Sequence, residues 1–484
     1  MLIRQTLLYL PAQLIGPLFQ FIAAIVWTHW LLPDAYGVLT FIMAAQELAF
    51  VLCMGWWTHY TLRYVGSFSN GNDRRRFQDA DNAIMLAATA VQALIGVVVL
   101  KALGQPMTTL LVAGTVVFIT TRTMTSHLLE RARARGSIMI YTGGQIIGPV
   151  LGFGTAYAAV ACAAATPEAA IAGFALAQVL GLAWLWRALG LGVSFALPQR
   201  ALLAAALGYG LPLLGAGVIG WISLNGIRVI VEHMRGVDAV GLVSVGWGLG
   251  QRLASVVAML VTAAAYPLAV QHLQAGRRDE ALAQLSNNGA LLLALLAPSV
   301  VGIFMLAPEA VSLMIAAPFQ EVTLAVLPLA LVAGMVRNLR VHFADQVFLL
   351  MAKTHLMVYI NLVEAGAVTV LCAFGLHVGG FAGATAGCLA GSTIGTILGF
   401  AVGRIKFGLP LPVAHAARIL LATAAMGVAL ALPPWLQFAP LESARLLLKI
   451  GAGALTYGMA LALLYPGFVA LGTSRLRGLR VAAH

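Results

Sequence analysis

Charge is scarce in this sequence, and that scarcity indicates the class of protein. Only 9% of the 484 residues are Asp, Glu, Lys or Arg, whereas 61% are hydrophobic. About a quarter of the residues in an ordinary soluble protein are charged. The chain therefore lacks the polar residues needed to cover several soluble domains. This composition excludes an ordinary soluble protein and favours one that is largely embedded in a lipid bilayer.

Known catalytic and metal-binding motifs are also missing. The sequence has no GxxxxGK[ST] phosphate loop and no HExxH motif, and its ten histidines are scattered. An intrinsic ATPase and a zinc hydrolase are therefore not expected. The four cysteines all fall inside apolar runs, which predicts small buried residues and no disulfide or metal set: Cys53, Cys162, Cys372 and Cys388. We expect no metal, no cofactor and no enzymatic activity.

The net charge of +12 does not indicate a nucleic-acid partner. Arg outnumbers Lys by 24 to 4, and the basic residues lie in short loops between apolar runs without forming a continuous stripe. Short basic loops are typical of membrane proteins, in which they face the anionic cytoplasmic leaflet. Membrane lipids are therefore the expected partner of this charge.

Apolar runs of about 20 residues recur along the chain, and each is long enough to cross a hydrocarbon core of roughly 30 Å. They predict an all-α polytopic membrane protein with about fourteen transmembrane helices. The predicted spans lie near 7–31, 37–60, 82–103, 107–130, 137–162, 167–189, 203–231, 238–265, 285–307, 322–350, 356–376, 380–403, 414–436 and 446–470. A signal peptide is the alternative for residues 1–31, but this run is too long and contains Gln13, Pro17 and Gln20.

Positive charge alternates from one loop to the next. Basic residues cluster at 74–76, 131–135, 277–278, 404–418 and 475–480, and the intervening loops hold few. Because loops rich in Lys and Arg stay in the cytoplasm, this alternation places both termini there. The expected location is a bacterial inner membrane.

An internal repeat divides the chain. Two sets of residues match: Asp34-Ala35-Tyr36-Gly37 with Asp238-Ala239-Val240-Gly241 at an offset of 204, and Arg122, Arg135 and Tyr141 with Arg340, Lys353 and Tyr359 at an offset of 218. Six spans per copy give both copies the same orientation, so their pseudo-twofold axis runs along the membrane normal with a substrate path between them. We predict two six-helix lobes, 1–192 and 193–410, followed by two additional helices and a basic tail, 411–484.

Short motifs at these positions resemble a known family. They are Pro33-Asp34-Ala35-Tyr36-Gly37, Tyr209-Gly210-Leu211-Pro212 and Tyr266-Pro267. They are similar to motifs of the bacterial O-antigen and exopolysaccharide flippases, which belong to the multidrug, oligosaccharidyl-lipid and polysaccharide exporter superfamily. The resemblance covers essentially the whole chain. Family members often carry an Asp-Arg pair late in the seventh span, but here Ile227 precedes Arg228, so a role for that acid cannot be carried over.

The resemblance implies a function. It implies export of an undecaprenyl-diphosphate-linked oligosaccharide by alternating access of the two lobes. It also implies a polysaccharide polymerase and chain-length proteins as functional partners.

Charged residues deep inside the spans are the candidate site residues. An Arg at a helix centre costs about 2.5–3.5 kcal/mol on insertion scales, so it usually faces a protein interior or a water-filled cavity. Five arginines qualify as substrate-binding candidates: Arg122, Arg228, Arg252, Arg337 and Arg340. Guanidinium groups bind diphosphate oxygens bidentately, which predicts a cationic cavity between the lobes. The alternative is that each Arg pairs with an acid or a carbonyl and only stabilises helix packing.

Two acids, Glu47 and Glu364, are similarly deep and are candidates for coupling transport to protons. Glu47 lies close to the repeat-related position of Arg252, so an ion pair between these two is the structural alternative. Five deep amides could bind sugar hydroxyls or bridge helices: Gln46, Gln145, Asn225, Gln251 and Asn338.

Three other functions remain open. A multidrug exporter of the same superfamily would favour acids and aromatics around cationic drugs, whereas the deep charges here are mainly Arg. An integral membrane enzyme, such as a polysaccharide polymerase or acyltransferase, needs a catalytic loop. Asp79-Ala80-Asp81 has the spacing of a glycosyltransferase acid pair, but no nucleotide-binding domain surrounds it. A scaffold protein would not explain several deep arginines.

Overall fold

The computed structural model describes residues 2–68, 71–192, 194–431 and 442–465, and these are helical almost throughout. The helices, in chain order, are α1 (Leu2–Trp30), α2 (Pro33–Phe50), η1 (Val51–Gly55), α3 (Trp56–Tyr64), η2 (Val65–Ser67), α4 (Gly71–Ala102), α5 (Thr109–Ala134), α6 (Ile138–Cys162), α7 (Pro167–Ala188), α8 (Arg200–Arg235), α9 (Val237–Gln274), α10 (Arg278–Met314), α11 (Ala317–Leu339), η3 (Arg340–Ala344), α12 (Asp345–Leu350), α13 (His355–Phe407), α14 (Val413–Ala431) and α15 (Glu442–Leu464). The basic residues at 475–480, which were predicted to face the cytoplasm, lie outside the described part of the chain.

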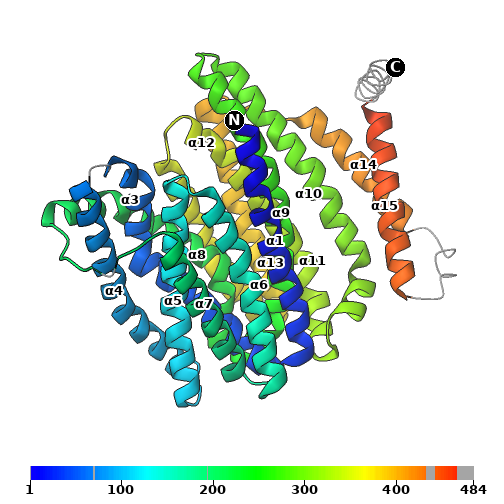
Figure 1. The fold of residues 1–484 in the computed structure, drawn as a ribbon. Helices are drawn as coiled ribbons and strands as arrows, with labels where there is room; N and C mark the ends of the chain where they lie inside the picture. The colour runs from blue at the N-terminus through cyan, green and yellow to red at the C-terminus, as the bar shows by residue number, and fades with distance from the viewer. Residues whose placement is uncertain (1, 69–70, 193, 432–441, 466–484) are drawn as a thin grey trace, which may run out of the picture.

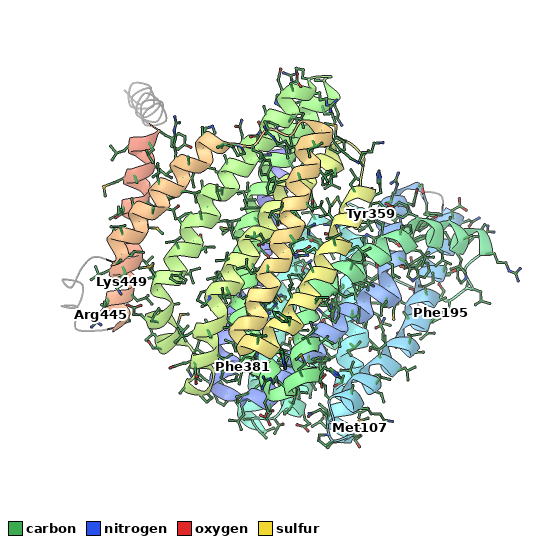
Figure 2. The ribbon with its side chains drawn as sticks, turned by 180° about the vertical axis from the view of Figure 1, so that it is seen from behind. Met107, Phe195, Tyr359, Phe381, Arg445 and Lys449 are labelled. Carbon is green, nitrogen blue, oxygen red and sulfur yellow. The ribbon has the colours of Figure 1, made fainter. Side chains whose placement is uncertain are left out.

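Among the described residues, eleven helices are long and apolar enough to cross a membrane. One of these, α13, is two helical limbs joined at Gly379 and Gly380. Gly380 adopts a φ of 59°, a value that suits glycine because it has no Cβ. In Figure 2, Phe381 lies at the turn between the limbs, and Tyr359 lies towards the opposite end. The limbs correspond to the spans predicted at 356–376 and 380–403, and the all-α fold of about fourteen helices is confirmed.

The first and second halves of the chain lie side by side (Figure 1). Helices α3 to α7 form one side of the bundle, and α10 to α13 form the other. Helix α1 lies between the halves and packs against both α6 and α9. The last two helices, α14 and α15, lie at the edge of the second half against α10, remote from α3 and α4 (Figure 1).

Two polar contacts attach α15 to α10. Lys449, labelled on α15 in Figure 2, forms an ion pair with Glu309. The Tyr457 hydroxyl donates a hydrogen bond to the carbonyl oxygen of Ala294 at 2.6 Å. Both contacts join the same pair of helices, so α15 is held to the second half of the chain.

Helices α2 and α9 begin in the same way and pack against each other where they begin. Each has an acid in its first turn, Asp34 or Asp238, where it interacts favourably with the helix dipole. A Cβ atom on Gly37 would lie 2.1 Å from the carbonyl oxygen of Val237, and a Cβ atom on Gly241 would lie 1.9 Å from that of Pro33. Only glycine permits this approach.

This Gly37–Gly241 contact is reciprocal, as a twofold relation requires. The two glycines differ by the repeat offset of 204, and so do Pro33 and Val237. The next polar pair, Thr40 and Ser244, has the same offset, and its hydroxyl oxygens lie 3.4 Å apart. The contact supports the repeat of α2 and α9 and a pseudo-twofold axis between them. The lobe boundaries at 192 and 410 stay predictions.

Helix α1 begins and α15 ends at the same end of the molecule, opposite the end where α2 and α9 begin (Figure 1). This arrangement agrees with an even number of membrane crossings between these two points. The side of the membrane on which they lie stays a prediction.

Candidate functional site

A cavity of about 180 Å³ lies between α1, α2, α5, α6, α7, α8 and α9. Its lining includes residues from both halves of the chain. They are Phe19, Gln20, Ala23, Ala24, Trp27, Tyr36, Leu39, Thr40, Met43, Ala44, Gln46, Glu47, Phe118, Arg122, Gly148, Pro149, Phe153, Phe174, Gln178, Asn225, Arg228 and Arg252. Tyr36 and Thr40 flank the Gly37–Gly241 contact in sequence, so this contact lies at one end of the cavity.

Four charged side chains line the cavity: Glu47 from α2, Arg122 from α5, Arg228 from α8 and Arg252 from α9. All four were candidates from the sequence, and the structure brings them together. Three guanidinium groups accompany a single carboxylate, so the lining carries a net charge of +2. The side chain of Glu47 is exposed in the cavity. The arrangement is suited to attracting an anion.

An amide links the carboxylate to one of the guanidinium groups. Asn225 donates a hydrogen bond from Nδ2 to Glu47 Oε2 at 3.1 Å, and its Oδ1 accepts one from Arg228 Nη1. Arg228 also donates from Nε to Ser244 Oγ at 3.2 Å. These bonds connect α2, α8 and α9 along one side of the cavity.

The other two arginines are oriented differently. Arg252 donates from Nη1 to the carbonyl oxygen of Gln20 at 2.9 Å, which links α9 to α1. Arg122 points towards α6, where a Cβ atom on Gly148 would lie 3.8 Å from its Nη1. Within the described residues Glu47 and Arg252 form no ion pair. The direct pair considered from the sequence is therefore not formed here, because Asn225 binds Glu47 instead.

Arg337 and Arg340 do not line this cavity, although they were expected to share it with Arg252. Arg340 is fully buried, and its Nη2 lies 2.5 Å from Glu364 Oε2 and its Nη1 3.5 Å from Asp345 Oδ2. Arg337 Nε lies 3.6 Å from Glu364 Oε1. Two arginines and two acids make this cluster neutral. Its partners come from α12 and α13, which sequence spacing along α11 alone could not reveal.

A second buried cluster was missed by the sequence analysis. Asp81 is fully buried and accepts hydrogen bonds from Trp57 Nε1 at 2.6 Å, from His127 and from Arg131. His127 lies 2.8 Å from the hydroxyl of Thr58. From the sequence, Asp81 was considered only as part of the Asp79-Ala80-Asp81 pair, whereas the structure makes it the common acceptor of α3 and α5. His127 and Arg131 are four residues apart on one helix face, and this spacing was the available signal.

Aromatic side chains form the apolar part of the cavity. Trp27 has its ring centroid 6.0 Å from those of both Phe153 and Phe174, and Phe118 lies 6.1 Å from Phe174. We refer to these four residues as the aromatic wall. They come from α1, α5, α6 and α7, all in the first half, whereas two of the three cavity arginines lie on α8 and α9.

The deep amides have different partners. Asn225 and Gln46 line the cavity, and Gln46 also donates to the hydroxyl of Thr123 at 3.2 Å. Gln251 donates to the carbonyl oxygen of Ala330 on α11, and Asn338 bonds within its own helix. Helix bridging therefore accounts for Gln251, and Asn225 is the amide that contacts cavity charges.

The described residues contain no group of three or more His, Cys, Asp or Glu side chains that could hold a metal ion. Cys372 and Cys388 are buried free thiols, as the sequence predicted. Cys53 is half-buried, and Cys162 at the end of α6 is exposed, contrary to the prediction.

Comparisons with known proteins give similarity of structure only. No family model matches the sequence, and no curated protein sequence matches it significantly. The lipid II flippase MurJ in an inward closed conformation is similar over 96% of this chain and 100% of its own, with a TM-score of 0.74 and 13% identity. An inward-facing multidrug resistance transporter of the MATE family in the MOP superfamily covers 83% of this chain and 98% of its own (TM-score 0.62, 14% identity).

A third solved structure is also similar to this chain. It is a MOP superfamily transporter from Pyrococcus furiosus, whose title states that reverse polarity of its binding pocket suggests a different function. It matches 84% of this chain and 95% of its own, with a TM-score of 0.56 and 15% identity. At such low identities the likeness concerns the fold alone. The chain therefore has the fold that MurJ and the MATE transporters share.

Proposed function

We propose that this protein is a secondary transporter that moves an anionic, diphosphate-linked lipid oligosaccharide across a bacterial inner membrane. The observation that carries the proposal is the cavity between the two halves, where Arg122, Arg228 and Arg252 accompany the single acid Glu47. Transport proceeds by alternating access of the halves, with both termini in the cytoplasm and without covalent chemistry.

The chemistry of the three arginines favours a phosphate-containing substrate. A guanidinium keeps its charge at every cellular pH and offers planar pairs of donors that match phosphate oxygens. Three such groups on different helices can contact several oxygens of a diphosphate at once. The cavity volume of about 180 Å³ is below the range for small-molecule sites, roughly 300–1,000 Å³. In this conformation the cavity therefore suits a small anionic group, and a larger head group requires movement of the halves.

The fold supports a lipid-linked substrate. The structure titled as a lipid II flippase is similar to this chain over 96% of its length. The aromatic wall beside the arginines offers an apolar surface within the same cavity. Together these features favour a substrate with an anionic part and a less polar part, as the motif resemblance also implies.

Glu47 is the favoured coupling acid. Its side chain is exposed in the cavity, so water can exchange protons with it, whereas Glu364 is fully buried and paired with Arg340. Alternating exposure of Glu47 to the two sides of the membrane is how transport would follow a proton gradient.

A multidrug exporter is the second candidate. The aromatic wall and the exposed carboxylate of Glu47 are features suited to a cationic drug, and the MATE transporters share the fold. The net charge of +2 in the cavity lining opposes this function, because it repels a cation.

Reconstituted protein distinguishes the two candidates. In proteoliposomes with and without a pH gradient, we expect flipping of a fluorescent undecaprenyl-diphosphate oligosaccharide and little transport of ethidium. Arg252→Ala should lower flipping at least tenfold, about the effect of one lost charge-assisted hydrogen bond. The matched control is Arg277→Ala, because Arg277 is an exposed residue paired with Glu280. Ethidium transport without lipid flipping would contradict the proposal.

A further inference from the structure

Five side chains form a ring that joins the two halves just inside the Gly37–Gly241 contact. Thr40 Oγ1 lies 3.4 Å from Ser244 Oγ, which accepts from Arg228 Nε at 3.2 Å. Arg228 bonds to Asn225, and Asn225 donates to Glu47 at 3.1 Å. Thr40 and Glu47 are seven residues apart on α2 and thus on the same face of that helix, so the backbone of α2 closes the ring.

Asn225 bonds to both charged side chains of the ring. Its amide is buried and uses its oxygen for Arg228 and its nitrogen for Glu47. Only one orientation of an amide satisfies a guanidinium and a carboxylate at once, because the guanidinium only donates and the ionised carboxylate only accepts. The amide therefore fixes the positions of both charged groups relative to each other.

We propose that Asn225 is a positioning residue through which an anion bound at Arg228 opens the end of the molecule where α2 and α9 begin. The inference rests on the proposed function, since it takes the transported substrate to be an anion. Asn225 need not touch the substrate to have this role.

Competition for Arg228 supplies the physical reason. A phosphate oxygen is a stronger acceptor for a guanidinium than the neutral oxygens of Asn225 and Ser244. Once Arg228 donates to phosphate, the ring loses its links to α9 and within α8. The Asn225–Glu47 bond still joins α8 to α2, but the hydroxyl contact between Thr40 and Ser244, which joins α2 to α9, is long and weak. A ligand shifts a conformational equilibrium when it binds one state better, and an anion binds Arg228 better once the ring is open.

Competition for Arg228 also makes the opening of the ring selective for anions. A neutral or cationic molecule in the cavity does not compete for Arg228, so the ring remains intact and the halves stay in contact. Because of Asn225, only an anion opens the ring, and other molecules that fit the cavity do not.

The test measures the distance between the halves in the full chain. Spin labels are attached at Leu32→Cys and Arg235→Cys, two exposed positions on either side of the Gly37–Gly241 contact, after the native cysteines are replaced by Ser. Distances are recorded in lipid nanodiscs with and without inorganic pyrophosphate. Pyrophosphate should increase the long-distance fraction in the otherwise unchanged protein.

Asn225→Ala should raise the long-distance fraction at least tenfold without pyrophosphate, because it removes hydrogen bonds to two charged groups, Glu47 and Arg228. Pyrophosphate should add little. Ser244→Ala should act in the same direction and serves if Asn225→Ala does not fold. The matched control is Asn338→Ala, which removes a buried amide bonded within its own helix and should respond as the parent protein does.

Two results separate the inference from the proposed function. Pyrophosphate binding, measured by calorimetry, that is equal in the parent protein and Arg252→Ala would overturn the proposed function. Binding that depends on Arg252, together with a parental distance distribution in Asn225→Ala or Ser244→Ala, would overturn the role of Asn225 alone.

Discussion

Arg122 in the first half and Arg340 in the second occupy matching positions in the internal repeat but have opposite surroundings. Arg122 faces the cavity beside Gly148, whereas Arg340 is fully buried between Glu364 and Asp345. The neighbouring helices explain the difference, because α6 has no acidic residue and the first limb of α13 carries Glu364. The acid on the adjacent helix, more than the depth of the arginine, determines whether that arginine is available to a ligand.

The two surroundings have different energetic consequences. A buried ion pair loses its hydration, and removal of one partner leaves an uncompensated charge in the interior. An arginine in an open cavity keeps part of its hydration and attracts anions. We therefore expect changes in the second-half cluster to affect stability, and changes in the cavity to affect binding.

The largest effect is expected from Glu364→Gln. This change leaves Arg340 and Arg337 without their shared acid and should lower the free energy of unfolding by about 3–5 kcal/mol. Thermal melting in detergent would measure the loss. Adding Arg340→Met removes the buried charge and should restore part of the stability. If Glu364→Gln melts at the parental temperature, the cluster does not stabilise the second half.

A smaller effect is expected when the first half is made to resemble the second. Gly148→Asp places an acid beside Arg122, where the glycine leaves room, and should weaken pyrophosphate binding about tenfold by neutralising one guanidinium. Gly148→Asn, of the same size but uncharged, should bind within about twofold of the parent protein, since it lacks the added charge. Calorimetry would measure both. Equal loss in the two variants would indicate a steric effect and no role for the charge of Arg122.

The smallest effect is expected from Glu47→Gln. The change raises the net charge of the cavity lining and should tighten pyrophosphate binding about threefold, the size of one charge interaction across a hydrated cavity. Gln can still accept a hydrogen bond from Asn225, so the fold should be unaffected. In proteoliposomes the variant should also lose its response to a pH gradient. Retention of the full response would remove Glu47 as the coupling acid.

The sequence predicted much of the fold because membrane-spanning helices depend on local composition. The apolar runs identified the helices, and the matching Asp34 and Asp238 segments identified two helix starts that pack together. Arg122, Arg228, Arg252 and Glu47 were identified by depth alone, since a charge far from the membrane surface requires a polar environment.

The pairing of the second-half charges could not be predicted. Arg252 and Arg340 both lie deep within predicted spans, so the sequence made both candidates for the cavity. Only the three-dimensional packing of α11, α12 and α13 shows that Arg340 is neutralised by acids. The π-helical turn that begins at Arg340 also shifts the helical register, so the 3.6-residue spacing does not predict which way its side chain points. The Asp81 cluster was missed for a related reason, because its partners Trp57 and Arg131 come from separate helices.

A comparison of Arg122→Ala with Arg340→Ala tests the central claim most directly. Pyrophosphate affinity and melting temperature would be measured for both variants in the same detergent. We predict that Arg122→Ala loses about tenfold in affinity and melts near the parental temperature. Arg340→Ala should melt much lower, because the buried Glu364 and Asp345 lose the cation that they share. A normal affinity in Arg122→Ala, combined with a specific loss of binding in a stable Arg340→Ala, would contradict the assignment of the cavity as the anion site.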